Sequence, residues 1–282
     1  MLCVLLGLDR AGKSSIKVYL ETLNADLASR TEMSNGIEVY QRGSLKIEIF
    51  PGQRRLRYNE RLYQVFFPMA QKILFVFDAA DRARFGEVEK YFRYVEQMIE
   101  KYCREEPELI FVAHKQDLEG AIDAREFFDS IIRKTKISKV QFLNTSIYDP
   151  WSMADLLKAV HGTDRVGTDS IVDTLRRLCS AEFAFIYDGH ILPLAYSPRL
   201  NDSVLLVNIN DVVCSLEKLG QIEAFVGFFR DKNFAIVSVT DDDNERVLVG
   251  VLGFSKSLRE TLALCRETGS KYLRLYRGRL WT

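Results

Sequence analysis

The chain has 282 residues, of which 47% are hydrophobic and 28% charged, and its 39 lysines and arginines balance 39 aspartates and glutamates. This composition is typical of a globular chain long enough for two domains, and it excludes a disordered one. A net charge of zero argues against nucleic acid or an anionic membrane as a direct partner, because both need a clustered basic excess. The five cysteines form no C-x-x-C pair, so free thiols in a reducing, cytoplasmic compartment are expected.

The sequence contains no signal peptide, no apolar run of membrane-spanning length, and no motif for N-terminal myristoylation or C-terminal prenylation. We therefore expect a soluble protein that reaches a membrane only through partners. The three histidines lie far apart, so they predict no metal cluster.

Strand patterns alternate with helical patterns through the first 162 residues. Apolar runs at residues 2–6, 37–40, 45–50, 73–77, 109–113 and 140–143 predict strands. A glycine-rich turn follows the first run and leads into a helix from Ser14, residues 42–44 predict a hairpin turn, and residues 85–102 have helical spacing. Strands separated by helices imply a mostly parallel sheet, so residues 1–162 are predicted to form an α/β domain.

Residues 163–169 are rich in glycine, threonine and aspartate and predict a linker. Beyond it, the predicted order is helix, two strands, helix, three strands, helix. These elements occupy residues 170–179, 183–187, 191–196, 203–219, 223–229, 234–239 and 246–250, with the last helix starting near Ser257. The order predicts a smaller α+β domain over residues 170–282, without an obvious catalytic motif.

Residues 7–14 match the phosphate-binding pattern G-x-x-x-x-G-K-[ST] in full. The glycines let backbone N–H groups surround phosphate oxygens, and the following helix adds its positive end. Lys13 is predicted to contact the β- and γ-phosphates, and Ser14 to bind Mg²⁺. A chance glycine turn is the weaker interpretation, because a strand precedes the motif and a helix follows it.

A second motif, His114-Lys115-Gln116-Asp117, directly follows the strand at 109–113. The Asp117 carboxylate can accept hydrogen bonds from N1–H and the exocyclic amine of guanine together, whereas N1 of adenine is itself an acceptor. Lys115 is expected to lie along the ring. Asparagine is usual at the first position, and His114 departs from it. The alternative is a solvated polar loop.

Two weaker signals complete the predicted nucleotide site. Ser146 and Ile147 follow a strand, where backbone N–H groups can bind the guanine oxygen, although serine after a strand is also common turn chemistry. Thr31 lies 18 positions after Lys13 and is the candidate switch threonine for Mg²⁺, with Thr22 as a less well placed competitor.

The third motif is Phe50-Pro51-Gly52-Gln53, in which Gly52 can bind the γ-phosphate and Gln53 can orient the attacking water. The aspartate that usually holds Mg²⁺ through water is expected at position 49, which is isoleucine. Glu48 is adjacent, but strand alternation directs it to the opposite face. The metal site is therefore predicted to be weakened, and hydrolysis is left open.

Three arginines follow the third motif, at positions 54, 55 and 57. A solvated surface is the favoured interpretation for them, with phosphate binding by one of them as the alternative. Asp78, at the end of the strand at 73–77, is a less favoured replacement ligand for the metal.

The motifs together resemble those of the Rag GTPases, and most closely the C/D-type Rag branch. The resemblance rests on residues 50–53, on histidine in place of asparagine at 114, and on Thr145-Ser146-Ile147-Tyr148-Asp149. The order of the second domain is similar to the roadblock or longin-like domain of that family. The resemblance implies a Ras-like P-loop domain that binds GTP or GDP with Mg²⁺, and a homo- or heterodimer with a Rag-like GTPase through residues 170–282.

The site carried by these motifs has Gln53 in the catalytic role and Ser14 and Thr31 as metal ligands. The predicted nucleotide-binding residues are Asp9, Arg10, Ala11, Gly12, Lys13, Ser14, Ser15, Thr31, Gly52, His114, Lys115, Asp117, Ser146 and Ile147. A competing resemblance to Arf-like proteins, through residues 75–78 and 115–118, is placed second, because those proteins lack a second domain and usually begin with an amphipathic helix. Two functions are open: a slow GTPase switch, which is favoured, and a hydrolysis-deficient scaffold subunit.

Overall fold

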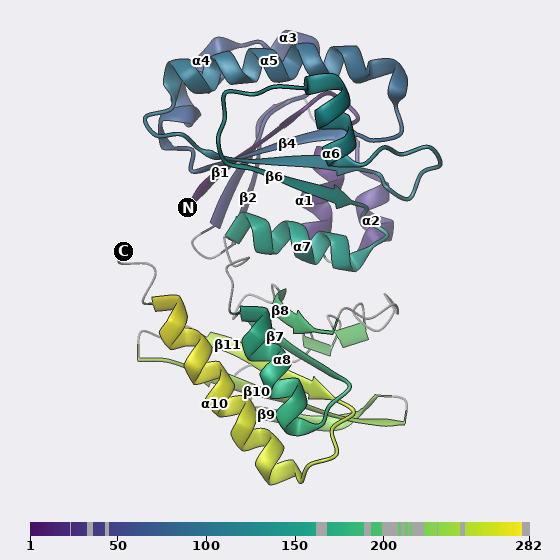
Figure 1. Cartoon of the computed structure of the whole chain (residues 1–282), viewed down its shortest axis with the longest axis vertical. Coiled ribbons are helices and arrows are strands. Elements are labelled where there is room, and N and C mark those ends of the chain that lie inside the picture. Colours follow the sequence, from purple (N-terminus) through teal and green to yellow (C-terminus); the bar gives the residue numbers. More distant parts are fainter. Residues whose placement is uncertain are drawn as a thin grey trace. The chain divides into compact units, whose positions relative to one another are not determined.

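The computed structural model describes residues 1–22, 24–32, 36–42, 45–161, 168–188, 193–198, 208–209, 212–213, 215, 223–229, 231–242 and 246–277. The chain divides into two compact units, Met1–Leu156 and Leu157–Thr282 (Figure 1). Among the described helices, none is long and apolar enough to cross a membrane.

The first unit is built on a six-stranded sheet in the order β2-β3-β1-β4-β5-β6. The strands are β1 (Leu2–Gly7), β2 (Glu38–Arg42), β3 (Leu45–Ile49), β4 (Lys72–Asp78), β5 (Glu108–His114) and β6 (Val140–Thr145). β2 and β3 pair antiparallel, and every other neighbouring pair is parallel. This confirms the predicted α/β class with a mostly parallel sheet. Two residues of the predicted hairpin turn, 43 and 44, lie outside the described part of the chain.

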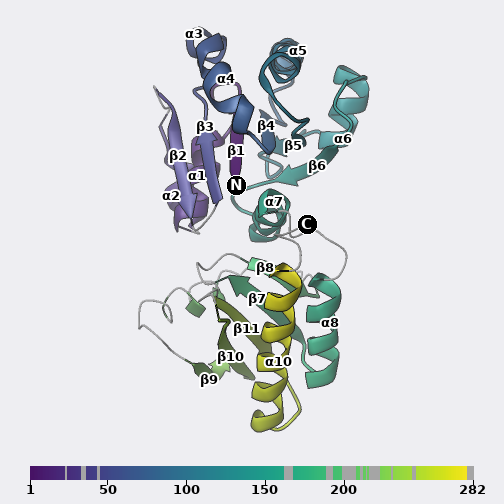
Figure 2. The same ribbon diagram turned by 90° about the vertical axis from the view of Figure 1, so that its left-hand side faces the viewer.

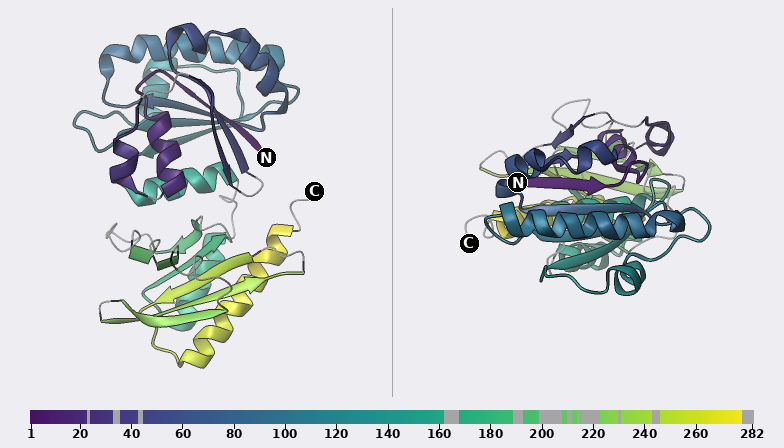
Figure 3. Two further views of the ribbon diagram at one scale, coloured as in Figure 1. Left: turned by 180° about the vertical axis from the view of Figure 1, so that it is seen from behind. Right: turned by 90° about the horizontal axis from the view of Figure 1, so that it is seen from above.

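Helices cover both faces of this sheet (Figure 2). The helices are α1 (Lys13–Thr22), α2 (Ala25–Ser29), α3 (Arg54–Arg57), α4 (Glu60–Phe66), α5 (Phe85–Tyr102), α6 (Ala124–Phe127) and α7 (Pro150–His161), with short turns η1 (Phe67–Met69), η2 (Arg82–Arg84) and η3 (Phe128–Ile132). α1 and α2 lie side by side (Figure 3, left), and α4 and α5 lie on the opposite face of the sheet from them. Both faces being covered explains why the central strands are continuous apolar runs.

The core between the sheet and α5 is aromatic. Phe111 of β5 stacks on Phe75 of β4 with ring centroids 5.4 Å apart, and Phe77 packs on Phe127 of α6 at 4.3 Å. α5 buries Phe85, Val88, Tyr91, Phe92, Val95, Met98 and Ile99, which share one face at helical spacing. This packing fixes the carboxyl ends of the parallel strands, and the site lies at that edge.

The second unit contains a five-stranded antiparallel sheet in the order β8-β7-β11-β10-β9. Its strands are β7 (Phe183–Asp188), β8 (Pro193–Ser197), β9 (Ala224–Phe229), β10 (Lys232–Thr240) and β11 (Arg246–Leu252). α8 (Thr168–Cys179) and α10 (Leu258–Arg277) cover one face of this sheet (Figure 1). The predicted strands and the flanking helices are therefore present.

Two features predicted for this half of the chain fall mainly on residues that the structure does not describe. These are the linker at 163–169 and the helix at 203–219. The described end of the predicted linker, residues 168–169, is already helical, because α8 starts at Thr168.

Candidate functional site

The site is a cavity at the edge of the first sheet where the parallel strands end. β1 ends at Gly7 and leads into the phosphate-binding loop, β5 ends at His114, and β6 ends at Thr145 beside it in the strand register. The cavity has a volume of about 410 Å³, within the usual range for a small-molecule site. A ligand at this edge follows the general rule for open α/β sheets.

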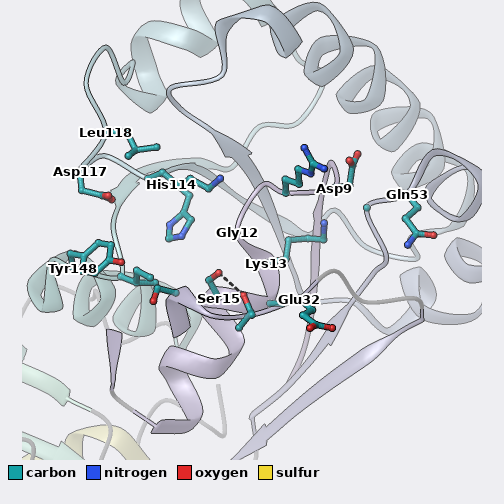
Figure 4. Close-up of a pocket in the computed structure, with 17 residues that line it drawn as sticks. Asp9, Gly12, Lys13, Ser15, Glu32, Gln53, His114, Asp117, Leu118 and Tyr148 are labelled. Carbon is teal, nitrogen blue, oxygen red and sulfur yellow. Dashed lines mark hydrogen bonds between the residues drawn. The ribbon is translucent and has the colours of Figure 1, made fainter. Parts of the chain in front are cut away.

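Most of the predicted nucleotide site lines this one cavity (Figure 4). The predicted residues in its wall are Asp9, Arg10, Gly12, Lys13, Ser14, Ser15, Thr31, Gly52, Gln53, His114, Lys115, Asp117 and Ile147. Ala11 and Ser146 are buried next to it. Lys13 and Gln53 lie toward one end of the cavity, and Asp117, Leu118 and Tyr148 lie at the other.

The phosphate-binding loop needs glycine at position 12 for two reasons. Gly12 has a φ of +95°, a conformation that other residues rarely adopt. A β-carbon there would also lie 2.2 Å from Cδ2 of His114, so a side chain has no room. The loop backbone therefore rests directly on the His114 ring.

Lys13 points its ammonium back into the loop. Nζ donates to the carbonyl oxygens of Gly7 at 2.9 Å and Leu8 at 2.7 Å. Burial lowers the pKa of Lys13 to about 7. A phosphate at this position would return a full positive charge to the side chain, because an anion nearby favours the charged form.

His114 replaces the usual asparagine and joins two parts of the site. Its Nδ1 shares a hydrogen bond of 2.8 Å with Oγ1 of Thr145, while its other edge faces Gly12. Burial lowers the pKa of His114 to about 4, so the ring is neutral at pH 7. The histidine thus ties the phosphate-binding loop to the end of β6.

The opposite end of the cavity carries the predicted base-binding group. Oγ of Ser146 donates to Oδ1 of Asp117 at 2.5 Å, which fixes the carboxylate. Lys115 pairs with Asp78 at 2.6 Å. Asp78 also accepts a hydrogen bond from the Ala80 N–H, and it does not line the cavity, so the less favoured role as a metal ligand gains no support.

The two predicted metal ligands have different partners. Ser14 Oγ donates to Oε1 of Glu38 at 3.0 Å. Thr31 Oγ1 hydrogen-bonds to Ser15 Oγ at 2.9 Å (Figure 4). Both hydroxyls line the cavity, but the structure links Thr31 to Ser15 and not to Ser14.

The third motif packs against the phosphate-binding loop. The Asp9 N–H donates to the Gly52 carbonyl at 3.1 Å, and a β-carbon on Gly52 would lie 2.3 Å from that nitrogen. Ile49 is 1% exposed. Glu48 pairs with Lys46 at 2.5 Å and does not line the cavity, as strand alternation predicts.

The surface interpretation of the arginines after this motif is wrong for Arg57. This side chain is 1% exposed, donates to the Gly52 carbonyl at 3.2 Å, pairs with Glu87, and lies over the Tyr91 ring. Arg54 and the arginine after it are exposed, as expected. Arg57 therefore anchors the third motif to α5.

Several residues of the site were missed by sequence reasoning. They are Ser29, Glu32, Leu118 and Tyr148 in the cavity wall and Glu38 next to Ser14. Leu118 and Tyr148 are 45% and 54% exposed, and they lie beside Asp117 (Figure 4). Leu118 directly follows Asp117 and Tyr148 directly follows Ile147, and these positions were the available signal.

A phosphate-binding loop, a glycine-glutamine motif and the aspartate of the predicted base-binding motif in one cavity are typical of P-loop nucleotide-binding switch proteins. The model of the ADP-ribosylation factor family matches residues 1–162. The chain therefore belongs to the ADP-ribosylation factor family of small GTPases, the resemblance that the motifs alone placed second.

Individual relatives agree with this family. ADP-ribosylation factor 1 of Brassica rapa subsp. pekinensis is 31% identical over 122 residues, which cover 43% of this chain and 63% of that protein. ADP-ribosylation factor-like protein 3 of Chlamydomonas reinhardtii is 33% identical over 129 residues, which cover 45% of this chain and 70% of that protein. The match thus spans less than two thirds of the length of the Brassica protein.

The chain is also similar to a solved structure. The Arl6 BBS3 small GTPase of Trypanosoma brucei, with bound nucleotide analogue GppNp, is 19% identical with a TM-score of 0.46, covering 58% of this chain and 96% of that one.

Proposed function

We propose that this chain is a guanine-nucleotide-dependent switch that binds GTP and GDP with Mg²⁺ and hydrolyses GTP slowly. The observation that carries the proposal is the single cavity that holds Lys13, Gln53 and Asp117 (Figure 4). Its volume and its donor set suit a nucleotide: loop N–H groups and an ammonium at one end, and a fixed carboxylate at the other.

At the phosphate end, the backbone of residues 9–14 and the Lys13 ammonium bind the phosphate oxygens. Ser14 and Thr31 supply hydroxyl oxygens to Mg²⁺, which neutralises charge on the phosphates when it is bound. The Gly52 carbonyl already contacts the loop through the Asp9 N–H, and the Gly52 N–H is proposed to bind the γ-phosphate.

At the base end, Asp117 accepts hydrogen bonds from guanine while Ser146 holds its carboxylate in place. Lys115 and the exposed Tyr148 flank the base. Ile147 lines the cavity, and its N–H is proposed to donate to the guanine oxygen. An adenine would leave the Asp117 carboxylate facing an acceptor, which selects against ATP.

Gln53 carries the catalytic role of orienting the attacking water. A second candidate function is favoured by one observation, the buried Ile49 at the position of the usual metal-linked aspartate. If that loss stops turnover, the chain is a hydrolysis-deficient nucleotide-binding scaffold in a GTPase heterodimer.

Single-turnover GTP hydrolysis with Mg²⁺ separates these two functions. A switch predicts slow turnover that Gln53→Leu suppresses. Gln71 is an exposed glutamine outside the cavity, so the control variant Gln71→Leu should leave turnover unchanged. A scaffold predicts no turnover by the wild type and recovery in Ile49→Asp. Turnover that Gln53→Leu does not affect contradicts the role of Gln53.

We also propose that the chain acts as a Rag-like subunit that dimerises through its second unit, by a roadblock-type domain. The proposal is supported by the third motif at 50–53, by His114, and by the order of strands and helices after residue 168. β9 is an edge strand of its sheet and exposes Val226 and Phe228, which suits pairing with a second subunit. The proposed location is cytoplasmic, with membranes reached through partners.

A further inference from the structure

The pairing of β2 with β3 places a carboxylate residue opposite Ile49, the position where an aspartate is usual. Glu38 is the first residue of β2, and it lies directly opposite Ile49 in the antiparallel register of β2 and β3. Ile49, which has no carboxylate, and Glu38, which has one, are thus neighbours on adjacent strands. Directly paired residues of an antiparallel pair have β-carbons about 5 Å apart.

The Glu38 carboxylate contacts Ser14, at the end of the phosphate-binding motif, and Lys17 of α1. Oε1 accepts a hydrogen bond of 3.0 Å from Ser14 Oγ. Oε2 lies 3.3 Å from Nζ of Lys17, which is three residues after Ser14 on α1 and therefore on the same face of the helix. The Glu38 side chain is 22% exposed, so solvent screens these contacts only in part.

The direction of the first contact matters for a metal. A serine hydroxyl has one proton and two lone pairs. When Ser14 donates its proton to Glu38, both lone pairs of Oγ remain for a cation. A carboxylate behind a metal ligand fixes the orientation of that ligand and raises its basicity, and loss of such a partner typically costs 10- to 100-fold in metal affinity.

The other carboxylates around the loop have different partners. Asp9 pairs with Arg84 at 2.8 Å, Glu48 with Lys46, and Asp78 with Lys115. Glu32 lines the cavity and is exposed. Of the four carboxylates whose contacts are given above, Glu38 is the one that accepts a hydrogen bond from the Ser14 hydroxyl.

We propose that Glu38 is the positioning carboxylate of the Mg²⁺ site, in place of the aspartate absent at position 49. It orients the Ser14 hydroxyl toward the cation and supplies the negative charge that Ile49 cannot. This inference rests on the proposed binding of a guanine nucleotide with Mg²⁺. It predicts that the switch keeps its metal dependence despite the isoleucine.

The test is the rate at which fluorescently labelled GDP dissociates from the full chain as free Mg²⁺ is varied, with EDTA as the metal-free limit. For the wild type, Mg²⁺ is expected to slow dissociation. For Glu38→Gln, the free Mg²⁺ needed for half of that effect should rise at least about tenfold, while the rate in EDTA stays as in the wild type. Glu38→Asp should recover part of the Mg²⁺ response. Glu48→Gln is the matched control that should leave the response unchanged, because Glu48 pairs with Lys46 and does not line the cavity.

The outcomes separate this inference from the proposed function. An unchanged Mg²⁺ midpoint in folded Glu38→Gln, judged by its thermal unfolding, overturns the role of Glu38. Retention of labelled GDP by a wild type that does not respond to Mg²⁺ also overturns it, but leaves nucleotide binding intact. A wild type that binds no labelled GDP contradicts the proposed function and this inference with it.

Discussion

Acidification is expected to destabilise this protein through the buried histidine of its nucleotide site. His114 has an ordinary pKa of 6.5, and burial lowers it to about 4 in the folded chain. Between these values the unfolded chain binds a proton that the folded chain does not, so stability is lost as the pH falls through this window. The whole difference corresponds to about 3 kcal/mol, of which about 2 kcal/mol is lost between about pH 7.5 and about pH 5.

The assay is urea unfolding at these two pH values, for the wild type and for His114→Asn, in the same nucleotide state. Asparagine removes the titrating group and keeps a side chain that can hydrogen-bond to Thr145. The drop in unfolding free energy from the higher to the lower pH should be smaller in the variant by about 2 kcal/mol. Equal pH dependence in both proteins would show that the ring is not held neutral against Gly12, and would refute the reasoning.

Two further predictions concern packing and assembly. Arg57→Ala should lower the unfolding free energy by about 2 kcal/mol, because it removes a buried guanidinium that pairs with the partly exposed Glu87. The control Arg55→Ala, at an exposed position, should change the unfolding free energy by less than about 0.5 kcal/mol. Equal effects of the two substitutions in urea unfolding would contradict the anchoring role of Arg57. Phe228→Asp should convert the proposed full-length dimer to a monomer in light scattering, because Phe228 is 82% exposed on the edge strand β9. Leu178→Asp, at an exposed position of α8, should not, and a wild-type monomer at micromolar concentration would contradict dimerisation.

Much of the fold could be predicted because its signals are local. The apolar spacing of residues 85–102 gave the bounds of α5, and the full pattern at residues 7–14 gave the phosphate-binding loop. Short elements were harder to predict. α2 and α6 are five and four residues long, too short for a periodic pattern, and their N-caps Asn24 and Asp123 are common in turns as well.

The parts of the site that could not be predicted depend on contacts between distant segments. Glu38 reaches Ser14 only because β2 returns beside β3, and that register cannot be derived from the residues around position 38. Arg57 was assigned to the surface because it lies in a run of arginines, yet Glu87 and the tyrosines of α5 give it a buried partner. Burial of a charge depends on such partners and not on local composition.

The family assignment depends on the length of sequence compared. The motif at 50–53 and His114 are short and favour the Rag branch, whereas the match over residues 1–162 uses the whole first unit and identifies the ADP-ribosylation factor family. Both interpretations predict a guanine nucleotide in the same cavity. They differ in that only the Rag resemblance predicts a role for the second unit, which is dimerisation.

Binding selectivity tests the central claim most directly. Labelled GDP bound to the full chain should be displaced by GTP at stoichiometric excess and not by ATP, and Lys13→Ala should bind no labelled nucleotide. Asp117→Asn should weaken binding of the labelled GDP greatly, because guanine loses a carboxylate acceptor that Ser146 holds in place. Displacement by ATP as readily as by GTP, or labelled GDP bound as tightly by Lys13→Ala as by the wild type, would contradict the assignment of this cavity as a guanine-nucleotide site.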